Sequence, residues 1–327
     1  MTRHQRSPFI ASLLLLTTIG VGGLGGCAIF RSAGPYDVQK TDTADETWEK
    51  ARAAFDAEEW EAAGDAFQDV WTNHPSHVLA DDARFFEAES RYGRGKLQGA
   101  FVLYKAYLKE RPLSDHAPLI QRRLFDMGKF TIEAGRGGFL GLLDFAAEGA
   151  EMLEYLVSVF PNGDLADDSL KIMADYELSD NRALDAIEHL KELLQFYSES
   201  EWALHARLDL ARAYRSLNRG RDYDSDVLQR ALAEYRAYVE LVSSDPQRKA
   251  EYAEELARAE AERNEVVELL AEKSLAKAEY YLRTDAAEAA KAQLLSTIER
   301  FPGTAAANRA REQLGLDRPQ GTEGDSR

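Results

Sequence analysis

From Ala44 to about Leu314 the apolar positions recur with the period of an α-helix. Alanine, leucine, glutamate and arginine dominate this stretch, and these residues have high helix propensities. Because no alternating strand pattern of useful length occurs, the sequence predicts an all-α fold. The few prolines in the helical stretch stand at intervals, which indicates a repeated unit.

A recurring pattern marks the second helix of each unit. A small residue stands twelve positions before a proline, and a bulky apolar residue stands eight positions before it. The small residue allows close approach to the first helix, the bulky residue lies on the same face, and the proline ends the helix. The small positions are Ala63, Ala100, Gly149, Ala186 and Ala290, and the bulky positions are Phe67, Tyr104, Leu153, Leu190 and Leu294; Ser198 replaces the proline once.

This pattern is typical of tetratricopeptide repeats. It predicts an α-solenoid of about five tetratricopeptide-like helical hairpins, and a generic helical bundle with prolines by chance is the alternative. The first helices are expected at Ala44–Ala57, Leu79–Tyr92, Leu119–Ile132, Ala166–Leu178 and Ala203–Leu217.

Three steps between units, of 49, 48 and 56 residues, are much longer than the usual period of about 34 residues. The third unit contains a glycine-rich apolar insert at 133–149, and the fifth contains a polar insert at 218–226. A long helix, predicted at 247–284, precedes the last second helix. The solenoid is therefore expected to be irregular, with its boundaries at 44–315 and a disordered tail at 316–327.

The first 26 residues have a different pattern. Arg3 and Arg6 precede an uncharged run over 8–24 that ends in several glycines. The run is slightly shorter than the roughly 20 residues that a transmembrane helix needs. A basic start, an apolar middle and small residues at the end are typical of an export signal. A transmembrane anchor is the alternative, which the glycines disfavour.

The end of this run, Leu24-Gly25-Gly26-Cys27, resembles a bacterial lipobox. In that class the cysteine thiol is acylated and the chain is cut before it. The resemblance implies a signal peptide at 1–26 and a lipidated Cys27 at the start of a flexible tether, 27–43. Ordinary cleavage with a spectator cysteine is the alternative. Because Cys27 is the one cysteine in the chain, an intramolecular disulfide is excluded.

The lipobox, the five units, the insert in the third unit and the long helix, in this order, resemble the outer-membrane assembly lipoprotein family BamD, also called YfiO or ComL. Ala278-Glu279-Tyr280-Tyr281 and Phe301-Pro302 are similar to the last unit of that family. The resemblance implies a lipid anchor in the outer membrane, facing the periplasm. It implies protein partners, namely barrel-assembly subunits and unfolded barrel precursors. A lipid-anchored scaffold for division or peptidoglycan machinery is the second hypothesis.

Composition and motifs argue against nucleic-acid binding and against enzyme activity. The net charge of −17 disfavours binding to nucleic acid, whose phosphates would be repelled. The acid pairs Asp81-Asp82 and Asp167-Asp168 are expected at helix starts, where they complement the helix dipole. We therefore expect no enzyme activity, and no catalytic, cofactor-binding or metal-binding residues.

The insert in the third unit is the candidate for partner docking. It carries five large apolar side chains, Phe139, Leu140, Leu142, Leu143 and Phe145. Large exposed apolar patches are rare on soluble proteins. The insert is therefore either a plug packed on the helices of its own solenoid or a docking surface for a partner.

Overall fold

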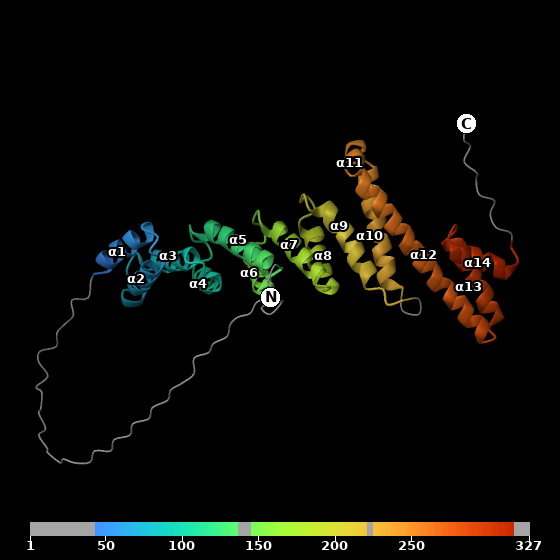
Figure 1. Ribbon diagram of the computed structural model, residues 1–327, viewed down its shortest axis with the longest axis horizontal. Helices are drawn as coiled ribbons and strands as arrows, with labels where there is room; N and C mark the ends of the chain where they lie inside the picture. The colour runs from blue at the N-terminus through green and yellow to red at the C-terminus, as the bar shows by residue number, and fades with distance from the viewer. Residues whose placement is uncertain (1–42, 137–144, 221–224, 317–327) are drawn as a thin grey trace, which may run out of the picture. The chain divides into compact units, whose positions relative to one another are not determined.

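The computed structural model describes residues 43–136, 145–220 and 225–316. The helical part forms one compact unit from Ala44 onward. Within the described ranges every regular element is a helix and no strand occurs, as Figure 1 shows. The helices are α1 (Ala44–Asp56), α2 (Trp60–Asn73), α3 (Ala80–Gly93), α4 (Leu97–Glu110), α5 (Ala117–Arg136), α6 (Ala146–Val159), α7 (Ala166–Ser179), α8 (Ala183–Phe196), α9 (Ala203–Ser216), α10 (Asp226–Ser243), α11 (Pro246–Glu251), α12 (Ala253–Arg283), α13 (Ala287–Arg300) and α14 (Ala305–Leu314).

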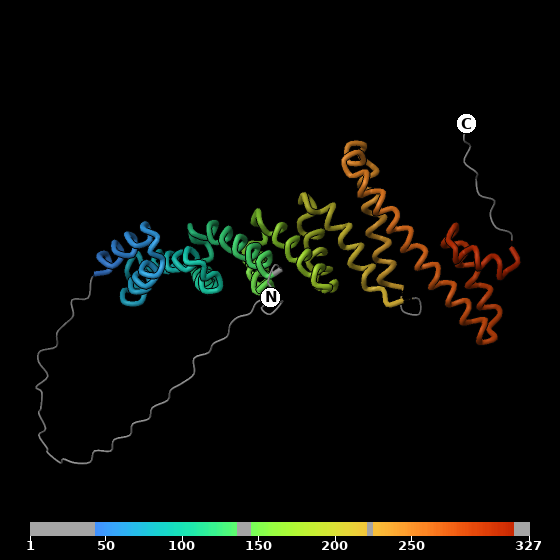
Figure 2. The backbone as a smooth tube through the Cα atoms, viewed as in Figure 1, coloured from blue at the N-terminus to red at the C-terminus, as the bar shows by residue number. Residues whose placement is uncertain are grey.

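Twelve of the described helices pair into six hairpins. The pairs are α1 with α2, α3 with α4, α5 with α6, α7 with α8, α9 with α10, and α12 with α13. Each hairpin also contacts the next one, and α14 packs on both helices of the last pair (Figure 2). The predicted α-solenoid of tetratricopeptide-like hairpins is confirmed. It has six hairpins where about five were expected, because α12 is the first helix of a complete pair.

The small and bulky positions of the repeat pattern form the interior of the hairpins. Ala63, Ala100, Ala186 and Ala290 are fully buried, and so are Phe67, Tyr104, Leu153 and Leu190, with Leu294 nearly so. The approach is very close in the third unit, where a Cβ on Gly149 would lie 2.6 Å from the carbonyl oxygen of Gly128 on α5. The small residue therefore permits close helix contact, as the pattern predicts.

The second helices also end in one common way. The residues that follow α2, α4, α6, α8 and α13 all leave the helical region, with φ between −134° and −121° and ψ between 48° and 61°. In four of the five cases the next residue is a proline, whose ring disfavours the helical conformation in the residue before it. Tyr197 has the same conformation before Ser198, so the turn persists without proline.

The acid pairs lie in the first turns of α3 and α7, as expected, and one acid of each pair also joins neighbouring units. Asp82 is 2.9 Å from His116 Nε2, and Asp168 accepts a 2.6 Å hydrogen bond from Trp202 Nε1. Both partners stand 34 residues after the acid, immediately before the next first helix. These acids are therefore structural links between repeats.

Ion pairs join the first helices of neighbouring hairpins at three places. The pairs are Glu89–Arg123, Lys171–Asp209 and Arg212–Glu262, with shortest distances of 2.8, 3.3 and 2.9 Å. Glu89 is almost fully buried and also accepts a hydrogen bond from the Tyr104 hydroxyl. Burial, followed by the charge of Glu89, raises the pKa of Tyr104, so this hydroxyl remains a donor.

Two predicted boundaries are wrong. The third-unit insert was expected at 133–149, but α5 continues to Arg136 and α6 begins at Ala146. The long helix was expected without interruption at 247–284, but Tyr252 separates the short α11 from the 31-residue α12. Asp245 and Pro246 start α11 as a separate helix, and the Tyr252 ring packs edge-on at 5.7 Å from His205. Neither the separate start of α11 nor the contact between Tyr252 and His205 was predicted from the sequence.

Candidate functional site

Most sequence-predicted site residues lie outside the described ranges. The lipobox residues Leu24, Gly25 and Gly26, the candidate lipidation site Cys27, and Phe139, Leu140, Leu142 and Leu143 of the insert all belong to this group. Their roles stay predictions. Phe145 is described, and it directly precedes α6 with 46% of its surface exposed.

The two ends of the insert are held together by close helix packing. A Cβ on Gly135, near the end of α5, would lie 2.7 Å from the backbone nitrogen of Ala146, the first residue of α6. The described residues on the two sides of 137–144 therefore lie close together on the third hairpin. Phe130 on α5 is also strongly exposed, at 61%. Exposed aromatic side chains thus occur on α5 and at the residue that directly precedes α6.

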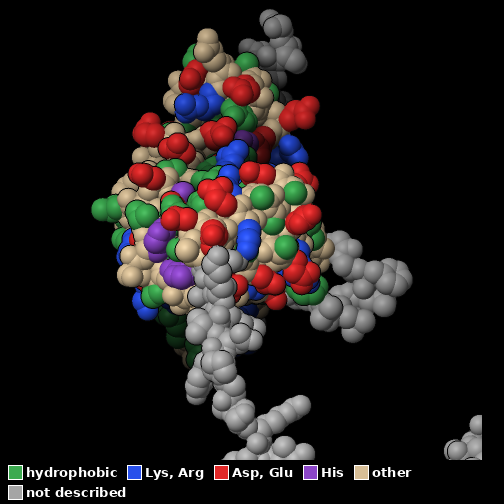
Figure 3. Space-filling model, turned by 90° about the vertical axis from the view of Figure 1, so that its left-hand side faces the viewer, with side chains coloured by type: hydrophobic (Ala, Val, Ile, Leu, Met, Phe, Trp, Pro, Cys, Tyr) green, Lys and Arg blue, Asp and Glu red, His purple; other side chains and the backbone are tan. Residues whose placement is uncertain are grey.

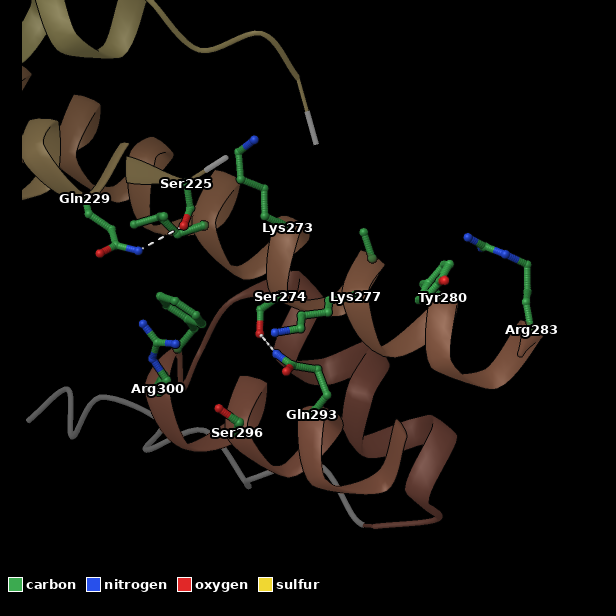
Figure 4. A pocket seen from close by; sticks show the side chains of 13 residues that line it. Ser225, Gln229, Lys273, Ser274, Lys277, Tyr280, Arg283, Gln293, Ser296 and Arg300 are labelled. Atoms are coloured by element: carbon green, nitrogen blue, oxygen red, sulfur yellow. Dashed lines mark hydrogen bonds between the residues drawn. The ribbon is translucent and has the colours of Figure 1, made fainter. Parts of the chain in front are cut away.

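A pocket that the sequence did not predict lies where the last hairpin meets α10. Its volume is about 560 Å³, and it lies between the start of α10 and the facing sides of α12 and α13 (Figure 4). Four cationic side chains line it. Lys273, Lys277 and Arg283 follow one another along α12, and Arg300 extends from the end of α13. No carboxylate is among the described residues that line the pocket.

The cations of this pocket differ in their partners. The Lys273 ammonium group donates a hydrogen bond to the Gly220 carbonyl oxygen. Lys277, Arg283 and Arg300 are exposed and form no ion pair within the described part of the chain. By contrast, the cations at the three links between repeats are all paired with acids. The pocket is therefore a local concentration of positive charge on an acidic protein.

Neutral polar side chains complete the pocket wall. Gln293 Nε2 donates a 2.8 Å hydrogen bond to Ser274 Oγ, and Gln229 Nε2 donates a 2.9 Å bond to Ser225 Oγ. Both bonds are drawn as dashed lines in Figure 4. They use the amide nitrogens of the two glutamines, so the amide oxygens take no part in them. Tyr280 adds an aromatic ring that is 54% exposed. The wall can therefore donate, accept and make apolar contacts.

Other pockets and faces have a different charge pattern. A pocket of about 740 Å³ beside Phe196 is lined, among the described residues, by the acids Asp164, Asp167, Glu192 and Glu199 and by no cation. On the face seen in Figure 3, acidic, basic and hydrophobic side chains are interspersed. The cationic pocket is therefore a local feature and does not reflect the general character of the surface.

The helical spacing of several pocket residues can be read from the sequence. Lys273, Lys277 and Tyr280 are spaced i, i+4, i+7, and Ser296 and Arg300 are spaced i, i+4, so each set shares one face of its helix. The sequence alone does not show that the two faces meet, because α12 and α13 could pack in several rotations.

Metal clusters and membrane-spanning helices are both absent from the described ranges. These ranges contain no group of histidine, cysteine and acidic side chains that could hold a metal ion. Among the helices of the same ranges, none combines the length and the apolar character needed to cross a bilayer.

Known proteins resemble the chain in fold alone. No family model matches it, and no curated protein sequence matches it. Similar solved structures include a tetratricopeptide repeat protein from Parabacteroides merdae ATCC 43184, at 13% identity and a TM-score of 0.32, covering 82% of this chain and 97% of that chain. Another is a thermophilic TPR protein from Thermus thermophilus, at 16% identity and a TM-score of 0.30, covering 66% of this chain and 100% of that chain. With TM-scores this low, the fold assignment rests on the helix order and packing described above.

Proposed function

We propose that this protein is a lipid-anchored, periplasm-facing scaffold for the assembly of β-barrel proteins of the outer membrane. The observation that carries the proposal is the order of its irregular units. The third hairpin carries an insert whose ends are held together at Gly135 and Ala146, and the long helix α12 precedes the last second helix. This order, after a lipobox-like leader, is that of the BamD family.

A scaffold role suits a solenoid of this kind. Stacked hairpins bury their small and bulky positions between helices and leave extended surfaces of side chains for partner binding. In the resembling family the N-terminal units face the precursor and the C-terminal units meet the central barrel subunit. On this basis we assign Ala44–Pro112 to precursor binding and Asn181–Leu314 to partner binding. Binding rather than catalysis is the activity we propose for both regions.

The lipid anchor is proposed at Cys27. The Cys27→Ser variant should leave the membrane fraction on washing without detergent, while its far-ultraviolet circular dichroism remains that of the helical fold. Serine has nearly the same size but lacks the thiol that attacks a lipid donor. A variant that remains in the membrane with a normally processed leader would contradict the assignment. Ala28→Ser, a change of similar size next to the cysteine, is the control and should remain anchored.

The assembly role is tested by binding to the periplasmic domains of the barrel-assembly subunit from the same bacterium. Immobilised full-length protein should retain these domains, and excess soluble protein should compete. No retention of a folded, competent partner would refute the assembly role. The second hypothesis, a scaffold for division or peptidoglycan machinery, predicts a different result on depletion. Outer-membrane barrel proteins should then stay at normal levels while septation or envelope integrity fails.

A further inference from the structure

We propose that the cationic pocket formed by α10, α12 and α13 binds an acidic peptide segment of a partner protein in an extended conformation. The inference goes beyond the scaffold role, because it names the chemistry of one site. It holds for any partner that presents such a segment, whether or not that partner assembles barrels.

The first argument is charge. The protein carries a net charge of −17, yet Lys277, Arg283 and Arg300 have no acidic partner within the described residues. Like charges gathered in one hollow repel each other, and a bound anion relieves this repulsion. A partner with carboxylates is therefore attracted to this pocket although the rest of the protein repels it. Salt weakens such an attraction between exposed groups.

The second argument is spacing. Lys277 and Arg283 are six residues apart on α12, which corresponds to about 9 Å along the helix axis. An extended peptide of about three residues covers the same length, at roughly 3.3 Å per residue. Arg300 extends from α13 on the other wall, so the carboxylates of a bound peptide would lie near cations of both helices. A single phosphate group is too compact to contact all of these cations.

The third argument is the neutral part of the wall. The amide oxygens of Gln229 and Gln293 can accept hydrogen bonds from a peptide backbone, and the hydroxyl of Ser296 can both donate and accept. The exposed ring of Tyr280 offers an apolar surface for a side chain that lies between two acids. A peptide that alternates acidic and apolar residues therefore matches the wall better than a purely acidic one.

The test uses the full-length protein in detergent and a fluorescent octapeptide in which glutamate alternates with leucine. Fluorescence anisotropy should show saturable binding that weakens as salt is raised. The double variant Lys277→Gln/Arg300→Gln should bind at least about tenfold more weakly, because two charge-assisted contacts are lost. The matched control Lys249→Gln/Lys291→Gln removes the same charge from exposed positions of α11 and α13 outside the pocket, and should bind within about twofold of the unmodified protein.

Circular dichroism would reveal a misfolded pocket variant, and three further probes keep the test decisive in that case. On the unmodified protein, a peptide with glutamine in place of glutamate should bind at least about tenfold more weakly. Equal binding of the two peptides, or equal loss in the pocket and control variants, would overturn the proposal. So would complete displacement of the peptide by inorganic phosphate at matched ionic strength, which would indicate a compact-anion site. Pocket-dependent binding of phosphatidylglycerol vesicles without peptide binding would assign the pocket to a lipid headgroup and overturn it as well.

Discussion

The contact between α5 and α6 tests the physical basis of the repeat pattern. Gly149 occupies the small position of the third unit, and a Cβ there would lie 2.6 Å from the Gly128 carbonyl oxygen and 2.8 Å from the Ile132 nitrogen. Both are backbone atoms, so no side-chain rotation can relieve the clash. In Gly149→Ala, α6 would have to move away from α5 by about 0.8 Å to reach an ordinary contact distance of about 3.4 Å.

The expected cost follows from two opposing terms. Overpacking a well-packed interior costs about 1–3 kcal/mol. Replacing glycine by alanine inside a helix returns about 0.5–1 kcal/mol through backbone entropy. We expect a net loss of about 1–2 kcal/mol, which corresponds to a drop of about 0.5–1 M in the urea midpoint for an m-value of about 2 kcal/mol per M.

The matched control is Gly99→Ala on α4. A Cβ at Gly99 would meet its nearest neighbour, Arg91 Cδ, at 3.5 Å, which is an ordinary contact. The same substitution should therefore stabilise the protein by about 0.5–1 kcal/mol at this position. Urea unfolding followed by circular dichroism measures both variants. A midpoint for Gly149→Ala equal to or above that of Gly99→Ala would refute the close-approach argument.

Two further predictions concern the links between units, and a third concerns a partly buried histidine on α8. Arg123→Met should destabilise the protein by about 3–5 kcal/mol because it leaves the buried Glu89 carboxylate without its cation. Adding Glu89→Leu should restore most of the thermal midpoint, and an equally unstable double variant would contradict this explanation. Trp202→Phe removes the hydrogen bond to Asp168 and should cost about 1 kcal/mol in urea unfolding. Burial lowers the pKa of His189, so its contribution to stability is complete above about pH 6.5 and is lost as pH falls further, because the unfolded chain then binds the proton more readily. His189→Gln should therefore flatten the decline in unfolding free energy between about pH 7 and 5, and an unchanged slope would exclude this origin.

The helical hairpins were predictable where one local pattern of small and bulky residues specifies them. The small and bulky positions are set by the requirement that two helices touch, and this spacing recurs in the second helices of five of the six described hairpins. Ala63 with Phe67 and Ala290 with Leu294 could therefore be placed inside the solenoid from the sequence alone. The sixth hairpin was not predicted because α12 is unusually long and is also the first helix of the pair that it forms with α13.

Element boundaries depended on contacts that no local pattern contains. Tyr252 interrupts the expected long helix without a glycine or a proline, and its ring packs near His205, which is far away in the sequence. Helix propensity favoured continuation through this residue, and tertiary packing overrode it. The acid pairs show the same limit. Their place in the first helical turn was predictable, but the link from Asp82 to His116 depends on how one repeat packs on the next.

The cationic pocket shows why function was harder to predict than fold in this chain. Its charges come from α12 and α13, and the sequence intersperses them with acids such as Glu272, Glu279 and Glu299. Neither helix has a positive charge when its residues are summed, so composition cannot reveal the site. Packing separates the signs: Glu272 turns to pair with Arg309 on α14, while Lys277 and Arg300 face the pocket. A solenoid can therefore carry a strongly acidic net charge and still recognise an acidic partner, because binding depends on the charges that line one hollow and not on their sum over the chain.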